Sequence, residues 1–204
     1  MRAVNFYGAK GGQGVTVSAC LAGISWAWSG LSVVIVSADD DAAAVLALGR
    51  LDVHQSVDVD GACLDGRPGR LQLVRADVVG ETWLGDGVDV VIYDGWPAGH
   101  GCTDLLVTQC DYLALSRFTR SGVVPSGVVV VAEPGRALSV RDVAAVIDRP
   151  VVATLERSQA IARQVDAGVL RVRRSPFPSV ECVQGLPMGK LDKLDGCWTD
   201  GVES

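Results

Sequence analysis

The residues best suited to chemistry form a glycine-rich loop between an apolar run and a helical pattern. The loop is Gly8–Thr16, GAKGGQGVT, and it has four glycines within seven residues. Glycines let several backbone N–H groups converge on one anion, and the helix that follows adds a favourable dipole. The alternative is a glycine-rich β–α turn that binds nothing. The strand, the glycines and the buried helix together make this alternative the weaker one. The loop predicts phosphate binding by Gly8, Lys10, Gly11, Gly12, Gln13, Gly14, Val15, Thr16 and Val17.

The spacing within the loop selects one type of phosphate site. It fits G-x-x-x-x-G-K-[ST], the P-loop pattern, in every position except the lysine, where Val15 stands. Lys10, inside the loop, is the cation that could compensate. The dinucleotide pattern G-x-G-x-x-G does not fit, which counts against a dinucleotide-binding oxidoreductase with Asp39 on a ribose.

Two carboxylates follow apolar runs elsewhere in the chain. Asp39 follows Ser32–Val36, and Asp94 follows a run that begins at Val88. Each Asp alone could be a solvated turn residue. Ligands of open α/β sheets bind at the carboxyl ends of the strands, where both would lie beside the loop. A hydroxyl and carboxylates suit Mg²⁺, so Thr16, Asp94 and Asp39 are chemically able to bind this ion.

The elements that must position these residues alternate between short β-branched runs and helical periods. This alternation predicts an α/β fold: a mostly parallel twisted sheet covered by helices on both faces. Residues 49–69 are expected to form a loop. The expected strands are Ala3–Tyr7, Ser32–Val36, Leu71–Arg75, Val88–Tyr93, Tyr112–Ser116, Val128–Ala132 and Val151–Leu155. The expected helices are Gly14–Ser29, Ala42–Leu48, Asp77–Leu84, Ser139–Ile147 with Ser139 as N-cap, and Arg157–Val169.

Length and composition set the outer limits. The chain has 204 residues, 49% of them hydrophobic and 21% charged, with a net charge of -6. These values are typical of a globular domain and argue against binding nucleic acid through overall charge. No apolar run approaches a bilayer span and no signal peptide is evident, so a cytoplasmic protein with reduced cysteines is expected. We expect a domain over residues 1–170 and an extended C-terminal tail over 171–204.

The motifs resemble those of the ParA/MinD superfamily. Its deviant Walker A pattern, K-G-G-x-G-K-[ST]-[ST], matches Lys10–Thr16 with Val15 as the single replacement. The stretch SADDD at 37–41 is similar to switch I of that family, and DGWPAG at 94–99 to its switch II. The resemblance implies ATP and Mg²⁺ as cofactors, with Thr16 and Asp94 on magnesium. It also implies that Asp39 positions the attacking water and that Lys10 crosses a dimer interface to the partner's nucleotide.

Several positions depart from the family pattern. Val15 removes a cation that stabilises charge in phosphoryl transfer, so weak or absent ATP hydrolysis is expected. Ser37 replaces the first switch I Asp, and Trp96 fills the first proline position of switch II. The branch resembling CpaE, TadZ and BcsQ tolerates a replaced P-loop lysine. The asparagine that reads adenine in many members is not evident.

Partners are likewise implied by the resemblance. The expected partners are a second copy of the chain, in a nucleotide-dependent homodimer, and a protein adaptor or cargo. The expected role is in DNA partition or in positioning a cellular assembly. The arginines that could hold DNA non-specifically are Arg157, Arg163, Arg171, Arg173 and Arg174, although a solvated surface explains them equally well. The segment Leu186–Gly196 is short and contains two aspartates, which disfavours a membrane helix. The competing hypothesis is a pseudo-ATPase scaffold that binds no nucleotide.

Overall fold

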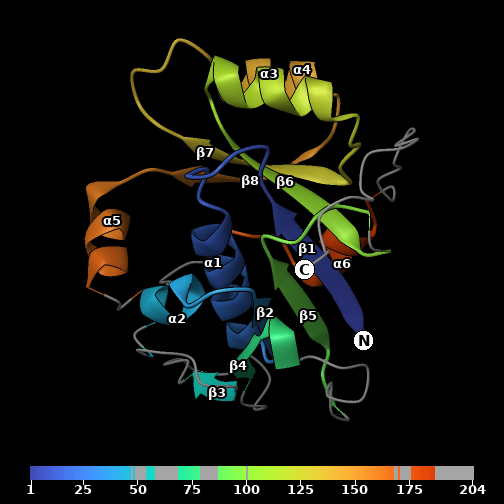
Figure 1. Cartoon of the computed structure of the whole chain (residues 1–204), viewed down its shortest axis with the longest axis vertical. Helices are drawn as coiled ribbons and strands as arrows, with labels where there is room; N and C mark the ends of the chain where they lie inside the picture. Colours follow the sequence, from blue (N-terminus) through green and yellow to red (C-terminus); the bar gives the residue numbers. More distant parts are fainter. Residues whose placement is uncertain are drawn as a thin grey trace, which may run out of the picture.

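The computed structural model is built around one eight-stranded sheet (Figure 1). It describes residues 1–46, 48, 54–57, 69–78, 87–99, 101–167, 170 and 176–186. The strand order is β3-β4-β2-β5-β1-β6-β7-β8, and only β3 is antiparallel to its neighbour. The strands are β1 (Arg2–Tyr7), β2 (Ser32–Ser37), β3 (His54–Val57), β4 (Arg70–Arg75), β5 (Val90–Asp94), β6 (Thr103–Gln109), β7 (Gly127–Ala132) and β8 (Val151–Glu156). The expected α/β class with a mostly parallel sheet is confirmed.

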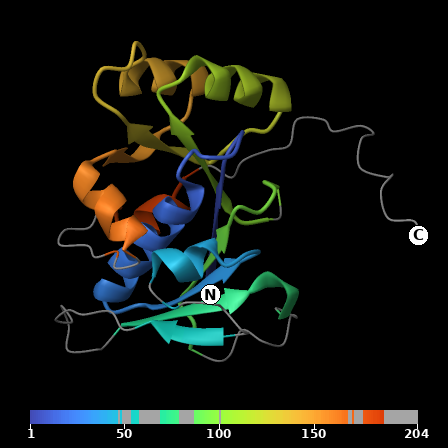
Figure 2. The same ribbon diagram turned by 60° about the vertical axis from the view of Figure 1, so that its left-hand side comes forward.

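Helices cover both faces of this sheet (Figures 1 and 2). They are α1 (Val15–Trp28), α2 (Asp41–Val45), α3 (Tyr112–Ser121), α4 (Val140–Ile147), α5 (Gln159–Asp166) and α6 (Val180–Gln184). Side chains of α1, α2, α5 and α6 pack in one hydrophobic cluster, and those of α3 and α4 pack in a second cluster on the opposite face. Helix α1 is apolar on nearly all sides because the sheet and the other helices of its layer surround it.

Two sequence-based element predictions are wrong at the centre of the chain. Tyr112–Ser116 is the start of helix α3, not a strand, and the strand of this region is the preceding β6. The YLALS stretch alternates like a strand, but Asp111 caps a helix there by accepting a hydrogen bond from the Ala114 N–H. The expected loop 49–69 contains β3, which pairs with β4.

Other boundaries differ by a few residues. The expected N-cap Ser139 begins α4 with a full capping box to Asp142. Of the helix expected at Asp77–Leu84, the described part is the 3₁₀ turn Ala76–Val78, and residues 79–86 lie outside the described residues.

The expected C-terminal tail is packed in part. Phe177, Val180 and Val183 are buried in the α1-side core, and α6 lies within that segment. Trp26 Nε1 donates to the Pro178 carbonyl at 3.0 Å, and Phe177 packs edge-on against Phe6 and Trp26. Residues 176–186 therefore cover the sheet next to α1. Within the described ranges, no helix is long and apolar enough to cross a membrane.

A stagger in the sheet positions the site. On one side, Val4 of β1 pairs with Ile92, in the middle of β5. On the other side, Val4 pairs with Thr103, which is the first residue of β6. Strands β6 and β7 therefore extend past the end of β1, and Gln109 pairs with Val131 beyond it. Because β6 starts so far along β1, the crossover from β5 needs only residues 95–102. Parallel connections usually need a dozen residues or more, commonly with a helix.

Candidate nucleotide and magnesium site

The glycine-rich loop joins β1 to α1 at the carboxyl edge of the sheet. Gly12 and Gly14 have φ angles of +74° and +89°, which L-residues with a Cβ rarely adopt. Gly14 is the N-cap of α1, and no side chain caps this helix. The first N–H groups of a helix have no intrahelical partner, so this end of α1 presents donors to an anion.

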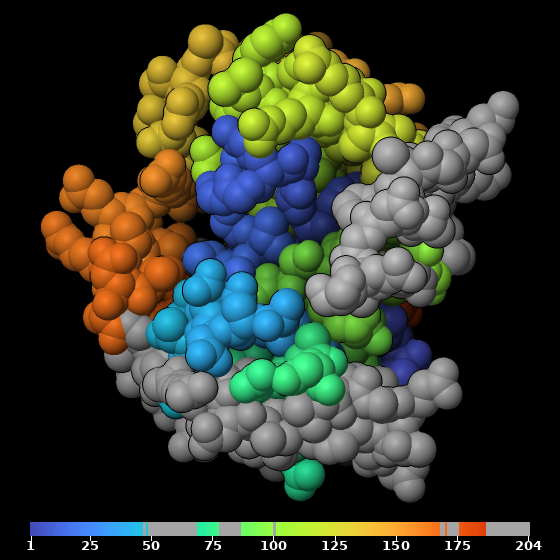
Figure 3. Space-filling view, in the orientation of Figure 1, coloured from blue at the N-terminus to red at the C-terminus, as the bar shows by residue number. Residues whose placement is uncertain are grey.

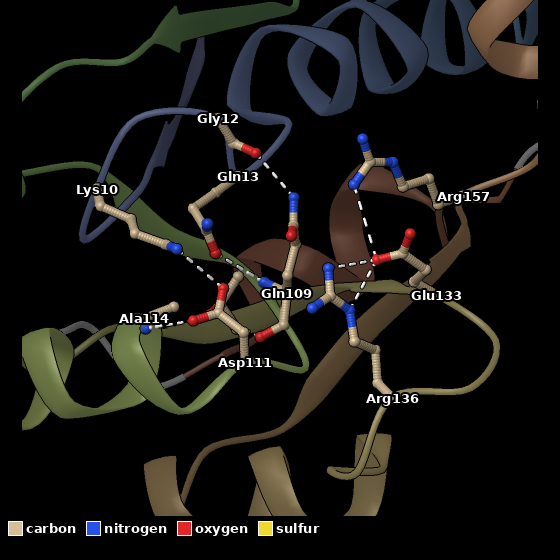
Figure 4. Close-up of polar contacts among 10 residues, drawn as sticks. Lys10, Gly12, Gln13, Gln109, Asp111, Ala114, Glu133, Arg136 and Arg157 are labelled. Carbon is tan, nitrogen blue, oxygen red and sulfur yellow. Dashed lines mark hydrogen bonds and ion pairs between the residues drawn. The ribbon is translucent and has the colours of Figure 1, made fainter.

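Two glutamines fasten the loop to the end of β6 (Figure 4). The Gln109 N–H donates to Gln13 Oε1 at 2.8 Å, and Gln109 Nε2 donates to the Gly12 carbonyl at 2.7 Å. Gln13 is buried, so its side chain supports the loop from beneath. The extension of β6 past β1 brings Gln109 to this position.

Lys10 is held within its own chain. Its ammonium lies 3.0 Å from Asp111 Oδ2, while Asp111 Oδ1 accepts from the Ala114 N–H at the start of α3. Burial raises the pKa of Asp111, but the Ala114 N–H and Lys10 outweigh it and the pKa is lowered. The loop and α3 are thus joined by an ion pair (Figure 4).

Val15 occupies the P-loop lysine position without replacing its charge. Its side chain is half-buried and packs against the α1-side core. A Cβ placed on Gly8 would lie 3.0 Å from Val15 Cγ2, so the two residues are in close contact. This position therefore points into the protein and contributes packing.

Asp94 and Thr16 come together beneath the loop. Asp94 ends β5, is 5% exposed, and accepts hydrogen bonds from the hydroxyls of Ser37, at 3.1 Å, and Thr16. Its Oδ1 is buried with no hydrogen-bond partner. Burial raises the Asp94 pKa to about 6, against the hydroxyl hydrogen bonds and with help from the charges of Asp39 and Asp41.

These groups fit a magnesium ion. A buried carboxylate oxygen without a partner, beside a hydroxyl and two further carboxylates, supplies the hard oxygen donors that Mg²⁺ prefers. In the described part of the chain, no group of three or more His, Cys, Asp or Glu side chains is arranged so that it could hold a metal ion by itself. Mg²⁺ usually takes one or two carboxylates and completes its shell with water and phosphate oxygens, so such a cluster is not required.

Asp39 lies at the exposed rim of this cluster. It follows β2, and its Oδ1 accepts from the Asp41 N–H at 3.0 Å, which shapes the turn into α2. Its charge acts on Asp94. The structure therefore gathers Thr16, Asp39 and Asp94 at one edge, as expected, with Lys10 held at the start of α3.

The loop after Asp94 is fixed by a buried polar network. Asn5 Nδ2 donates to Asp104 Oδ1 at 2.8 Å and to the Trp96 carbonyl at 3.2 Å. The Gly99 N–H donates to Asp104 Oδ2 at 2.9 Å. Asn5 and Asp104 are 1% and 3% exposed, so the stretch that follows Asp94 is tied to β1 and β6 from inside the protein.

A cavity of about 250 Å³ opens beside the loop, between α1 and α5. The space-filling view shows the surface hollowed between these segments (Figure 3). Val17 and Leu21 of α1 form one wall, Ile161 and Val165 of α5 the other. Gly12 and Gly14 lie on its lining, so it is continuous with the glycine-rich loop. An apolar slot of this kind suits a flat aromatic ring.

Comparisons with solved structures fix the fold. No profile of a protein family and no curated protein matches the sequence. MinD of Pyrococcus horikoshii, solved with Mg-ADP, gives a TM-score of 0.59 at 19% identity, covering 82% of this chain and 86% of that one. MinD in the MinC:MinD complex of Aquifex aeolicus gives 0.57 at 15% identity, with 82% and 86% covered. A ParA family ATPase of Chlorobium tepidum gives 0.51 at 15% identity, with 82% and 89% covered.

The chain has the MinD/ParA fold. The resemblance inferred from the loop and the two aspartates is thereby confirmed at the level of the fold. Within this MinD/ParA fold, the sequence pattern did not predict β6, so Gln109, Asp111 and Asp104 were not among the predicted site residues. An Asp followed by apolar residues at helical spacing, Asp111 before Leu115 and Phe118, is the signal that could have located α3.

The arginines predicted to hold DNA are only partly described. Arg171, Arg173 and Arg174 lie outside the described residues. Arg163 is exposed on α5, and Arg157 lies at the cavity.

Proposed function

We propose that this protein is a nucleotide-dependent switch that binds ATP·Mg²⁺ at the edge formed by the Gly8–Thr16 loop, Asp39 and Asp94. The observation that carries the proposal is the buried Asp94 carboxylate, with an unpartnered oxygen beside Thr16 and under an uncapped helix N-terminus. An uncompensated buried carboxylate costs stability, so its position is better explained by a cation that binds there.

Each group has a distinct task in this proposal. Backbone N–H groups of the loop and of the first turn of α1 bind the phosphates, and the α1–α5 cavity takes the nucleoside. Thr16 and Asp94 hold magnesium, and Asp39 orients water at the exposed rim. Bound magnesium supplies charge neutralisation on the phosphate oxygens.

Hydrolysis is expected to be weak or absent. Val15 packs into the core and brings no charge to the phosphates. Charge stabilisation provides most of phosphoryl-transfer catalysis, so a loss on the order of several kcal/mol in the transition state follows. The protein would then act by binding and release rather than by rapid turnover.

The output of the switch is proposed to be a homodimer that recruits a protein partner. The ParA/MinD resemblance implies that Lys10 reaches a second subunit. In this structure Lys10 is paired with Asp111 of its own chain. Dimerisation would therefore exchange an internal contact of Lys10 for one across the interface. A role in DNA partition or in positioning a cellular assembly follows from the resemblance, and DNA binding stays a prediction resting on the arginines named above.

Calorimetric titration of ATP, with Mg²⁺ or with EDTA, tests the proposal. The wild type should bind ATP·Mg²⁺ with micromolar affinity and lose at least about tenfold in EDTA. Thr16→Ala should lower affinity only when magnesium is present. The matched control Thr119→Ala, at an exposed position of α3, should match the wild type in both buffers.

Sedimentation of the same mixtures tests the dimer. Wild type with ATP·Mg²⁺ should sediment as a dimer, and Lys10→Ala should stay monomeric. Absence of heat with the wild type at millimolar ATP would reject the switch and favour the pseudo-ATPase scaffold.

A further inference from the structure

The missing P-loop lysine raises the question of which cation meets the phosphates. Lys10 is paired with Asp111, and Arg136 is paired closely with Glu133, at 2.5 Å and 2.7 Å through two nitrogens. Among the described lysines and arginines, Arg157 alone lines the cavity that Gly12 and Gly14 also line. It therefore faces the same space as the phosphate-binding loop.

The backbone of Arg157 is fixed on the far side of this space. Its N–H donates to the Ala132 carbonyl at 2.8 Å, which holds it at the end of β8. The next residue, Ser158, caps α5 by accepting from the Ile161 N–H at 3.2 Å. The side chain thus starts from a rigid junction between β8 and α5, across the cavity from α1.

The guanidinium itself is only loosely held. Arg157 Nη1 lies 3.7 Å from Glu133 Oε2, the oxygen that already bonds Arg136 at shorter distances (Figure 4). The Arg157 side chain is 56% exposed. A contact of this length to a shared carboxylate oxygen is weak, so a phosphate bound at the loop beside the cavity meets little competition for this side chain.

We propose that Arg157 binds the nucleotide phosphates from the wall opposite α1 and supplies the cation that the loop lacks at Val15. This inference rests on the proposed nucleotide function. A guanidinium suits phosphate because its planar donors can bond two oxygens at once. Arg157 is fixed on a different element from the loop, so it contributes to nucleotide affinity without restoring the lysine of the loop itself.

Affinity for ADP·Mg²⁺ separates this role from a general surface charge. Arg157→Gln should weaken ADP binding by on the order of tenfold, and Arg157→Lys should recover part of the loss. The matched control is Arg163→Gln, an exposed arginine on α5 that does not line the cavity, and it should bind ADP as the wild type does. Equal ADP affinity for wild type and Arg157→Gln would overturn the inference.

Adenosine, used as a competitor of ADP, tests whether the contact is to phosphate. It should bind wild type and Arg157→Gln equally, because it carries no phosphate. A parallel loss of adenosine affinity would show that Arg157 acts on the cavity and would reject the phosphate contact.

A variant that is expected to bind ADP more tightly keeps the test valid even if the other variants misfold. Glu133→Gln releases Arg157 and should strengthen ADP binding several-fold, a gain that the double variant Glu133→Gln/Arg157→Gln should lose. A gain that persists in the double variant would overturn the inference. Failure of the wild type to bind ADP at all would reject the proposed function and this inference with it, whereas wild-type binding unaffected at position 157 rejects the inference alone.

Discussion

Among single residues, Asp94 carries the largest electrostatic consequence. Its carboxyl is buried, and its pKa is about 6, above the usual 3.8, chiefly because burial disfavours the ion. The folded protein therefore holds this proton in a pH range where the unfolded chain has released it. Stability from this group is greatest below pH 4 and falls as the pH rises from about 4 to about 6.

The substitution Asp94→Asn tests this cost. In metal-free buffer at pH 7.5 the variant should be more stable than the wild type by up to about 3 kcal/mol, since the amide carries no charge. The difference should disappear near pH 4, where Asp94 is protonated. Urea unfolding of both proteins across this range measures it, and a constant difference at all pH values would contradict the prediction.

Asp111 combines two tasks that different substitutions separate. It pairs with Lys10 and caps α3. Asp111→Asn keeps a good N-cap and removes only the charge, so it should cost less than about 1 kcal/mol. Asp111→Ala also removes the cap and should cost about 1 kcal/mol more. Urea unfolding of the two variants decides this, and equal losses would mean that the cap contributes nothing.

At the scale of elements, Gly11 and Gly12 of the loop differ in backbone conformation and not in the space around them. Added Cβ atoms at Gly11 and Gly12 would meet nothing within 4 Å, but only Gly12 has a positive φ. Gly12→Ala should therefore cost about 1–2 kcal/mol, while Gly11→Ala should be close to neutral. Urea unfolding measures both changes, and similar effects at the two positions would show that the φ angle is not the cause.

The elements also show what the sequence could predict. Apolar runs rich in Val and Ile located β1, β2 and the strand that ends at Asp94, because buried parallel strands are almost continuously apolar. The glycine-rich loop before an apolar helical stretch located α1. Strand β6 was missed because it carries Asp104 and Thr108 inside its apolar run. Both are buried, and Asp104 is stabilised by the Asn5 side chain and the Gly99 N–H, partners far away or unrecognisable in sequence.

The site divides in the same way. Thr16, Asp39 and Asp94 could be proposed because each follows a recognisable strand or loop. The roles of Gln109 and Asp111 could not, because they depend on how far β6 extends past β1, and strand register is set by tertiary packing.

For the whole molecule, α6 and the residues before it matter to stability. Phe177 is 5% exposed and packs against Phe6 and Trp26 under the sheet. Phe177→Ala should lower the free energy of unfolding by about 3–5 kcal/mol because it leaves a cavity in the core. Glu181→Gln removes an exposed ion pair with Arg2 from the same segment and should change stability little. Denaturant titration compares the two, and a small loss for Phe177→Ala would show that this segment adds little to the fold.

The short crossover after Asp94 also limits how the molecule can transmit a signal. Residues 95–102 contain no helix in their described part, and Asn5 and Asp104 tie them to two strands. These hydrogen bonds restrict the movement of this connection when a ligand binds. The loop is joined to the end of β6 by the glutamine pair and to the start of α3 by the Lys10–Asp111 contact, and Tyr112 and Leu113 of α3 are exposed. A partner that senses ligand occupancy would read it at the start of α3.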